Sequence, residues 1–316
     1  MNSEKIKAQN RLSFFRRFII YQNERFPFLG HGLLIAAFTF SAVSYSRMCR
    51  GEEGFINWNI YGWGVFITVT LFFLLRIADE FKDREDDARY RTYLPVPRGL
   101  ISLKELQLLA IVVLLLQLCV LIFVFPSLFF LQLAVLFYLF LMRIEFGVPV
   151  WLKARPVLYM VSHMFIMPLI DIFASGLDWV LNDAEAPKGL LFFFGVSYMN
   201  GIVMETGRKI KPAELEEEGV VSYTKLWGVN PATVIWNIML AINATFAILA
   251  GWFAGYGKTS VITLGFLFFI FSIPAWIFLR KKNKTNAKLI EYASVAWTLL
   301  MYLILGAVPM IQKLIF

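Results

Sequence analysis

A dense group of acidic residues follows directly after a long apolar run. Six of the nine residues in Asp79–Asp87 (DEFKDREDD) are acidic, and the preceding residues 63–78 are mostly apolar. An uninterrupted helix turns by about 100° per residue, so it would present four of these acids within one arc of about 100°, with Arg76 on the same side. The four are Asp79, Asp83, Asp86 and Asp87. Carboxylates this close repel one another unless a cation lies among them, and such hard oxygen ligands favour Mg²⁺ or Ca²⁺.

Basic side chains beside this acidic segment could hold phosphate groups. Mg²⁺ usually shares its coordination with substrate phosphates, and Arg or Lys can bind the remaining oxygens. Pro95, Pro97 and Gly99 end the helix after the acids, and Ser102 with Glu105 forms a capping box that starts the next helix. We therefore expect a magnesium–diphosphate site in this region. The expected metal ligands are Asp79, Glu80, Asp83 and Asp87, and the expected diphosphate ligands are Arg76, Arg91 and Arg98.

A second polar segment, residues 205–228 (ETGRKIKPAELEEEGVVSYTKLWG), lies later in the chain. Glu205 and Lys209 are four residues apart, so on a helix they can either pair with each other or face a site together. We expect both to act in catalysis, together with Asp79, Asp83 and Asp87 of the first segment. Glu205 and Glu214 are the further expected metal ligands, and the further expected diphosphate ligands are Arg208, Lys209 and Lys211. The acids at 216–218 are interpreted as an exposed run of charge.

The composition places these segments in a membrane protein. Hydrophobic residues make up 59% of the 316 residues and charged residues only 16%, whereas soluble domains carry about 25% charged residues. Nine apolar runs are long enough to cross a bilayer as helices. They are approximately residues 28–46, 60–78, 106–123, 127–142, 155–175, 189–204, 234–254, 261–279 and 290–311. We predict an all-α integral membrane protein, a bundle of about nine transmembrane helices forming one domain over residues 28–316.

The distribution of basic residues predicts the orientation in the membrane. If residues 1–27 are cytoplasmic, then twenty-five of the thirty Lys and Arg lie on the cytoplasmic side, as the positive-inside rule requires. Both polar segments then face the cytoplasm, and the run 12–21 (LSFFRRFIIY) is interpreted as a helix in the membrane interface. The net charge of +8 is explained in this way, and with no basic stripe in a soluble domain we expect no nucleic-acid partner.

The first polar segment resembles the UbiA superfamily of intramembrane prenyltransferases. The first motif of that family reads N-D-x-x-D-x-x-x-D and corresponds here to Asp79-Glu80-x-x-Asp83-x-x-x-Asp87. A family segment similar to R-P-L-P-(S/R)-G-x-(I/V)-S follows, and residues 94–102 (LPVPRGLIS) match it apart from Leu94 and Val96. Residues 219–228 are similar to the end of the second family motif. The resemblance implies a UbiA-like bundle around a central cavity, with the N-terminus inside.

The chain departs from the family pattern in both motifs. Asp79 stands where the family has Asn, and Glu80 stands where it has Asp. The second family motif is typically D-x-x-x-D, and alignment backwards from Gly219 places Lys211 and Leu215 at those aspartates. Glutamates could hold a second metal ion here, or basic side chains could replace it.

The resemblance implies a Mg²⁺-dependent transferase that ionises an isoprenoid diphosphate and transfers the prenyl group to a small-molecule or lipid acceptor. Metal and basic groups would stabilise the leaving pyrophosphate, and the acceptor would attack the carbocation in a cavity shielded from water. One alternative is a UbiA-type membrane terpene cyclase, in which a double bond of the substrate attacks. Another is a non-catalytic carrier or ion transporter, which the intramembrane residues His163 and Asp171 would suit.

Overall fold

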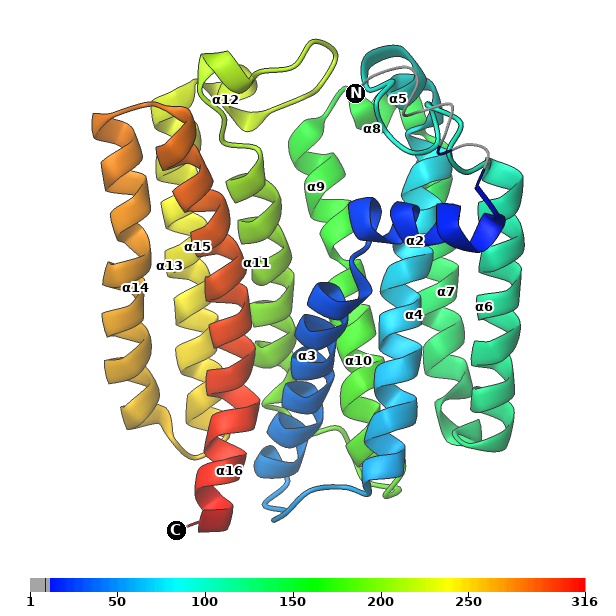
Figure 1. Ribbon diagram of the computed structural model, residues 1–316. Helices are drawn as coiled ribbons and strands as arrows, with labels where there is room; N and C mark the ends of the chain where they lie inside the picture. The colour runs from blue at the N-terminus through cyan, green and yellow to red at the C-terminus, as the bar shows by residue number, and fades with distance from the viewer. Residues whose placement is uncertain (1–8, 10–11, 316) are drawn as a thin grey trace. The chain divides into compact units, whose positions relative to one another are not determined.

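The computed structural model describes residue 9 and residues 12–315, and this part of the chain forms helices joined by turns, without a strand (Figure 1). Nine of its helical segments are long and apolar enough to span a membrane, so all nine predicted spans are confirmed. They are α3 (Phe28–Cys49), α4 (Trp58–Lys82), α6 (Leu103–Phe123), η1 (Pro126–Leu128) with α7 (Phe129–Arg143), α9 (Pro156–Met164) with α10 (Ile166–Trp179), α11 (Leu190–Arg208), α13 (Val229–Phe253), α14 (Gly257–Arg280), and α15 (Lys284–Tyr302) with η4 (Leu303–Ala307) and the start of α16 (Val308–Ile315).

The helix ends extend beyond several of the predicted apolar runs. The ninth span was expected from residue 290, yet α15 begins at Lys284 because the Asn283 side chain accepts a hydrogen bond from the backbone N–H of Asn286. This N-terminal cap stabilises a polar first turn that hydropathy alone does not count. The predicted capping box before α6 is confirmed, since Ser102 and Glu105 exchange both hydrogen bonds.

The chain divides into two compact units. Unit 1 comprises Met1–Ala36 and Gly62–Pro149, and unit 2 comprises Ala37–Tyr61 and Val150–Phe316. The single transmembrane domain over residues 28–316 stays a prediction.

In unit 1, the N-terminal helix α2 (Phe14–Arg25) lies across α4 (Figure 1). A buried cluster joins α2 to the start of α3, to α4 and to the first turn of α6. Its members are Tyr21, Phe26, Ile35, Phe73, Ile77, Ile101 and Leu106. The helix predicted within residues 12–21 is therefore present, and its apolar side is packed against protein. Its placement in a membrane interface stays a prediction.

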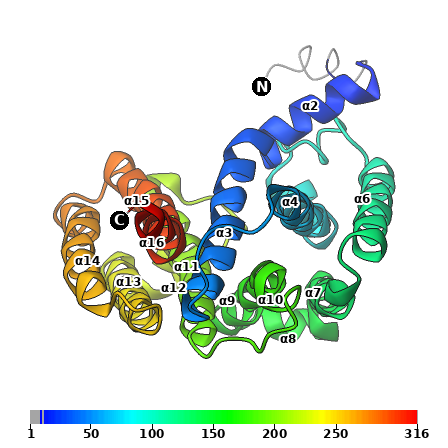
Figure 2. The ribbon, with the colours of Figure 1, turned by 90° about the horizontal axis from the view of Figure 1, so that it is seen from below.

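In unit 2, α11 packs against α10, α13 and α15, and α13 packs against α14 (Figure 2). Gly207, near the end of α11, makes the contact with α15 close, because a methyl group there would overlap the Ser294 hydroxyl. The Trp236 indole N–H donates to Ser294 Oγ at 3.0 Å and to the Val203 carbonyl at 3.2 Å. These bonds fix the helix end that carries the second polar segment.

Candidate functional site

The acidic residues of unit 1 lie at a junction between two helices. Helix α4 ends at Lys82 and α5 (Arg84–Tyr90) begins at Arg84, so the uninterrupted helix assumed above is broken at Asp83. The break is mild, because the N–H of Asp83 donates to the Asp79 carbonyl at 2.9 Å and the N–H of Asp87 donates to the Asp83 carbonyl at 2.8 Å. Helical hydrogen bonding thus passes through the junction and keeps these three aspartates near the helical spacing that the sequence predicts.

Each of the acids on α4 contacts a basic side chain. Asp79 accepts a hydrogen bond from Lys82 Nζ at 2.9 Å and lies 3.8 Å from an Arg76 nitrogen. The Glu80 side chain is only 1% exposed, and it lies 2.7 Å from Arg25 Nε and 3.4 Å from Arg76 Nε. Arg76 therefore lies between the two acids, as its position on the helix predicts.

Asp87 is buried on α5 and has Arg91 3.2 Å away as its ion-pair partner. Within the described residues, neither oxygen of Asp87 has a hydrogen bond of ordinary geometry. Burial raises the pKa of Asp87 and the charge of Arg91 opposes that rise. Burial also raises the pKa of Asp83, where Lys82 opposes the rise and Asp79 adds to it. Both carboxyl groups would gain from a cation between them.

Among the described residues, no three acidic, His or Cys side chains converge closely enough to hold a metal ion in their present orientations. Asp79, Glu80 and Asp87 point to basic side chains instead. The chemistry of the donors nevertheless fits Mg²⁺, because all of them are hard carboxylate oxygens and both Asp87 oxygens are buried without a hydrogen bond.

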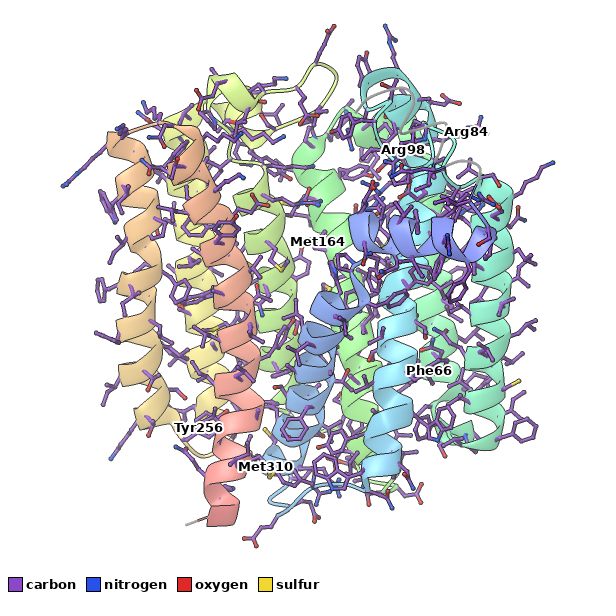
Figure 3. The ribbon with its side chains drawn as sticks, in the orientation of Figure 1. Phe66, Arg84, Arg98, Met164, Tyr256 and Met310 are labelled. Atoms are coloured by element: carbon purple, nitrogen blue, oxygen red, sulfur yellow. The ribbon has the colours of Figure 1, made fainter. Side chains whose placement is uncertain are left out.

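A cavity of about 220 Å³ opens beside these acids. It is smaller than the roughly 300–1,000 Å³ of pockets that enclose drug-sized ligands, so it suits a polar head group better than a whole lipid. Figure 3 shows Arg84 and Arg98 at the same end of unit 1. The lining residues are Glu80, Arg84, Asp87, Ala88, Val96, Pro97 and Leu103. Arg84 was not among the expected ligands, although it lies inside the acidic motif.

Helix α2 supplies partners that the sequence did not predict. Arg25 pairs with Glu80, and Tyr21 lies beside the same carboxylate. Burial raises the pKa of Tyr21, and the charge of Glu80 raises it further. Arg98, an expected diphosphate ligand, binds both Glu24 oxygens at 2.8 Å and the Tyr93 carbonyl at 2.8 Å, with its side chain 3% exposed. In this structure Arg98 therefore joins the 93–98 turn to α2.

In unit 2, Glu205 lies at the end of α11 between two basic side chains. It accepts a hydrogen bond from Arg208 Nε at 2.7 Å and lies 2.7 Å from Lys209 Nζ. Lys209 also lies 5.7 Å from the centre of the Tyr223 ring. The internal salt bridge, one of the two arrangements that the spacing allowed, is the one observed. The roles of these residues in binding metal or diphosphate stay predictions.

The loop after α11 is organised by its glutamates. Glu216 was interpreted as part of an exposed run, but this is wrong, because it is half-buried and accepts hydrogen bonds from Ser222 and Thr224 at 2.6 Å. Glu214 accepts the backbone N–H of Lys284 at 2.9 Å and so caps α15. Lys211 lies 3.4 Å from Glu217. The local patterns of charge did not indicate these loop contacts.

Comparison with known proteins gives the family and supports the fold. No curated protein matches the chain. A solved structure of digeranylgeranylglyceryl phosphate synthase is similar with a TM-score of 0.57 at 15% identity, covering 89% of this chain and 99% of that chain. This likeness confirms the all-α, UbiA-like membrane fold. The sequence model of the UbiA prenyltransferase family matches residues 36–304, which is most of the sequence. The chain is therefore a multi-pass membrane protein, and it belongs to the UbiA prenyltransferase family.

Proposed function

We propose that this protein is a Mg²⁺-dependent prenyltransferase that uses an isoprenoid diphosphate as the donor. Membership of the family supports prenyl transfer, and the arrangement at the end of α4 supports the place where the diphosphate binds. The observation that carries the proposal is the buried Asp87 carboxyl, without a hydrogen bond in the described structure, beside a cavity lined by Glu80 and Arg84.

Asp79, Asp83 and Asp87 would hold Mg²⁺, with Glu80 beside them. The ion, when bound, would neutralise the charge that develops on the leaving diphosphate. Arg84 lines the cavity, and Arg76 lies between Asp79 and Glu80, so both are placed to bind diphosphate oxygens. The allylic C–O bond breaks with its electron pair leaving on the diphosphate. The acceptor then forms a bond to the carbocation and loses a proton.

The donor is an isoprenoid diphosphate and the acceptor is a small molecule or lipid taken from the membrane. We place the N-terminus, the 79–98 segment and the 205–228 segment on the cytoplasmic side, since twenty-five of the thirty basic residues then face the cytoplasm. At such a site the diphosphate head of the donor would lie at the cytoplasmic surface while its apolar tail stays in the membrane.

The substitution Asp87→Asn tests the site. With a radiolabelled allylic diphosphate and membrane lipid extract as the source of acceptor, we expect diphosphate-dependent turnover to fall by about 100-fold or more, the usual scale for a lost electrostatic contact in catalysis. The matched control is Glu85→Gln, because Glu85 lies in the same segment but is 90% exposed. Full activity in Asp87→Asn, or equal losses in both variants, would refute the site.

A membrane terpene cyclase is the second candidate, and the second polar segment favours it. Glu205 is held by Arg208 and Lys209, and Lys211 stands where the family has an aspartate. Purified protein incubated with a prenyl diphosphate and no acceptor separates the two candidates. Release of a cyclised hydrocarbon would favour the cyclase. The transferase would be favoured if the prenyl diphosphate stays unchanged without acceptor and is consumed once acceptor lipid is added.

A further inference from the structure

A buried carboxyl group lies inside unit 2 on α10. Asp171 is 0% exposed, and the side chain beside it is Ser197 of α11. Among residues 12–315, neither oxygen of Asp171 receives a hydrogen bond of ordinary geometry. An ionised carboxylate without a basic partner is very unfavourable in such a place. The group must therefore be neutralised by a proton or by a bound cation.

The groups around Asp171 come from three further helices. The Tyr302 hydroxyl, at the end of α15, lies beside Asp171, Ser197 and Asn200, and it is the titratable group that faces the carboxyl. Asn200 Oδ1 accepts a hydrogen bond from Asn243 Nδ2 of α13 at 2.8 Å. All these side chains are buried, and within the described structure the Ser197 and Tyr302 hydroxyls lack hydrogen bonds of ordinary geometry.

These contacts favour a proton over a metal cation. Because the Asn200 oxygen already accepts from Asn243, the amide N–H groups of Asn200 are left for its other neighbours. An amide N–H repels a metal cation but donates to a hydroxyl or carboxyl oxygen. A protonated Asp171 supplies the donor that the Ser197 and Tyr302 oxygens lack, and it leaves the cluster electrically neutral.

A π-helix borders the cluster. The segment Leu303–Ala307 (η4) follows Tyr302 directly, and the hydroxyl of Tyr256, labelled in Figure 3, donates to the Leu305 carbonyl at 2.5 Å. Gly306 meets the backbone of Ser41 so closely that no side chain would fit. Such π-turns are rare and are frequently found at functional sites. This one is held on two sides, so it sets the position of Tyr302.

Asp178 lies seven residues further along the same helix and shows the opposite arrangement. It is also 0% exposed, but it lies 2.9 Å from Arg50, 3.3 Å from Arg47 and 2.8 Å from Ser46 Oγ. Two guanidinium groups hold it as an anion. The two carboxyl groups of α10 thus match in burial and differ in partners.

We propose that Asp171 is an intramembrane proton-binding site, in which the carboxyl carries a proton at neutral pH and exchanges it through the hydroxyl groups of Ser197 and Tyr302. In this exchange the Asp171 carboxyl gives its proton to the Ser197 hydroxyl oxygen, Ser197 gives its own proton to the Tyr302 hydroxyl oxygen, and Tyr302 returns a proton to the other carboxyl oxygen of Asp171, so that no net charge is formed. Intramembrane acids of this kind serve as proton relays elsewhere.

Substitution by asparagine tests the protonation state in the full-length protein in detergent. Asparagine is close in shape to a neutral carboxylic acid, so we expect the melting temperature of Asp171→Asn to stay within about 2 °C of the wild type at pH 6. The control Asp178→Asn removes a fully buried anion from two partly buried arginines, Arg47 and Arg50, and we expect a fall of roughly 6 °C or more. Equal falls in the two variants would overturn the proposal. So would a rise in wild-type melting temperature in NaCl over choline chloride that Asp171→Asn abolishes, because that result identifies a metal cation.

Chemical labelling gives a second, independent readout. An apolar carbodiimide reacts with protonated carboxyl groups, whose O–H adds across one C=N bond, and it does not react with carboxylates. Peptide mass spectrometry of the labelled wild type should show at least about tenfold more adduct at Asp171 than at Asp178, with less adduct as the pH rises. Equal labelling of the two positions, or none at either, counts against a bound proton.

Discussion

The ion pair between Arg25 and Glu80 is predicted to hold the N-terminal helix on the acidic motif. Arg25→Gln removes a guanidinium 2.7 Å from a carboxylate that is 1% exposed. Breaking a buried pair costs about 3–5 kcal/mol when the remaining charge has no partner. Arg76 still lies 3.4 Å from Glu80 and keeps a positive charge beside it, so we expect a cost below that range, about 2–3 kcal/mol. At roughly 2 °C per kcal/mol for a chain of this size, the melting temperature should fall by about 4–6 °C.

The assay is the fraction of protein that remains monodisperse after heating in detergent, measured for three variants. Arg16→Gln is the matched control, since Arg16 lies on the same helix but is exposed, and it should change the melting temperature by less than about 1 °C. The double variant Arg25→Gln with Glu80→Gln removes both charges and should recover part of the loss. A melting temperature of Arg25→Gln equal to that of Arg16→Gln would show that the pair does not hold α2.

Three further predictions follow from the site and its supports. Burial raises the pKa of Asp87 in the folded protein, so the wild type loses stability as the pH rises from below the unfolded carboxyl pKa of about 3.9 through the folded pKa. The melting temperature of Asp87→Asn relative to wild type should therefore be higher at pH 7 than at about pH 3, and a constant difference contradicts the assignment. Mg²⁺ and inorganic diphosphate added together should raise the wild-type melting temperature by more than the sum of the rises that each gives alone. Asp87→Asn should remove this additional rise, and purely additive shifts in the wild type speak against a joint site. Gly207→Ala should lower the free energy of unfolding by about 1–3 kcal/mol, because the added methyl group overlaps Ser294. The control Gly265→Ala, where nothing lies within 4 Å of the added carbon, should be neutral or stabilising by up to about 1 kcal/mol. Similar melting temperatures for the two variants would exclude the close contact.

Features that depend on neighbours in the chain could be predicted from the sequence. The nine spans followed from hydropathy, the cap at Ser102 followed from a glutamate three residues later, and the pairing of Glu205 with Lys209 was one of two arrangements that their spacing allowed. In each of these cases the rule that governs the structure acts within one or two helical turns.

Features that depend on distant parts of the chain could not be predicted in this way. Glu80 pairs with Arg25, which is 55 residues away in the sequence, and Arg98 pairs with Glu24, which is 74 residues away. No local pattern of charge predicts these partners. Arg98 is an expected phosphate ligand because it follows a proline-rich turn near the acids. In this structure its bidentate contact with Glu24 fixes the turn, and its role as a phosphate ligand stays a prediction. Asp171 was marked by its position inside an apolar span, but its neighbours come from three other helices.

The balance of charge at the end of α4 explains why metal and diphosphate should bind together. Four acids (Asp79, Glu80, Asp83 and Asp87) interact with four basic groups (Arg25, Arg76, Lys82 and Arg91), so the cluster is close to neutral as it stands. A dication alone would add uncompensated positive charge beside guanidinium groups, and a diphosphate alone would add negative charge beside carboxylates. When both enter, the acids can turn to the metal and the released basic groups to the phosphate oxygens. The net change is then small, and each ligand raises the affinity for the other.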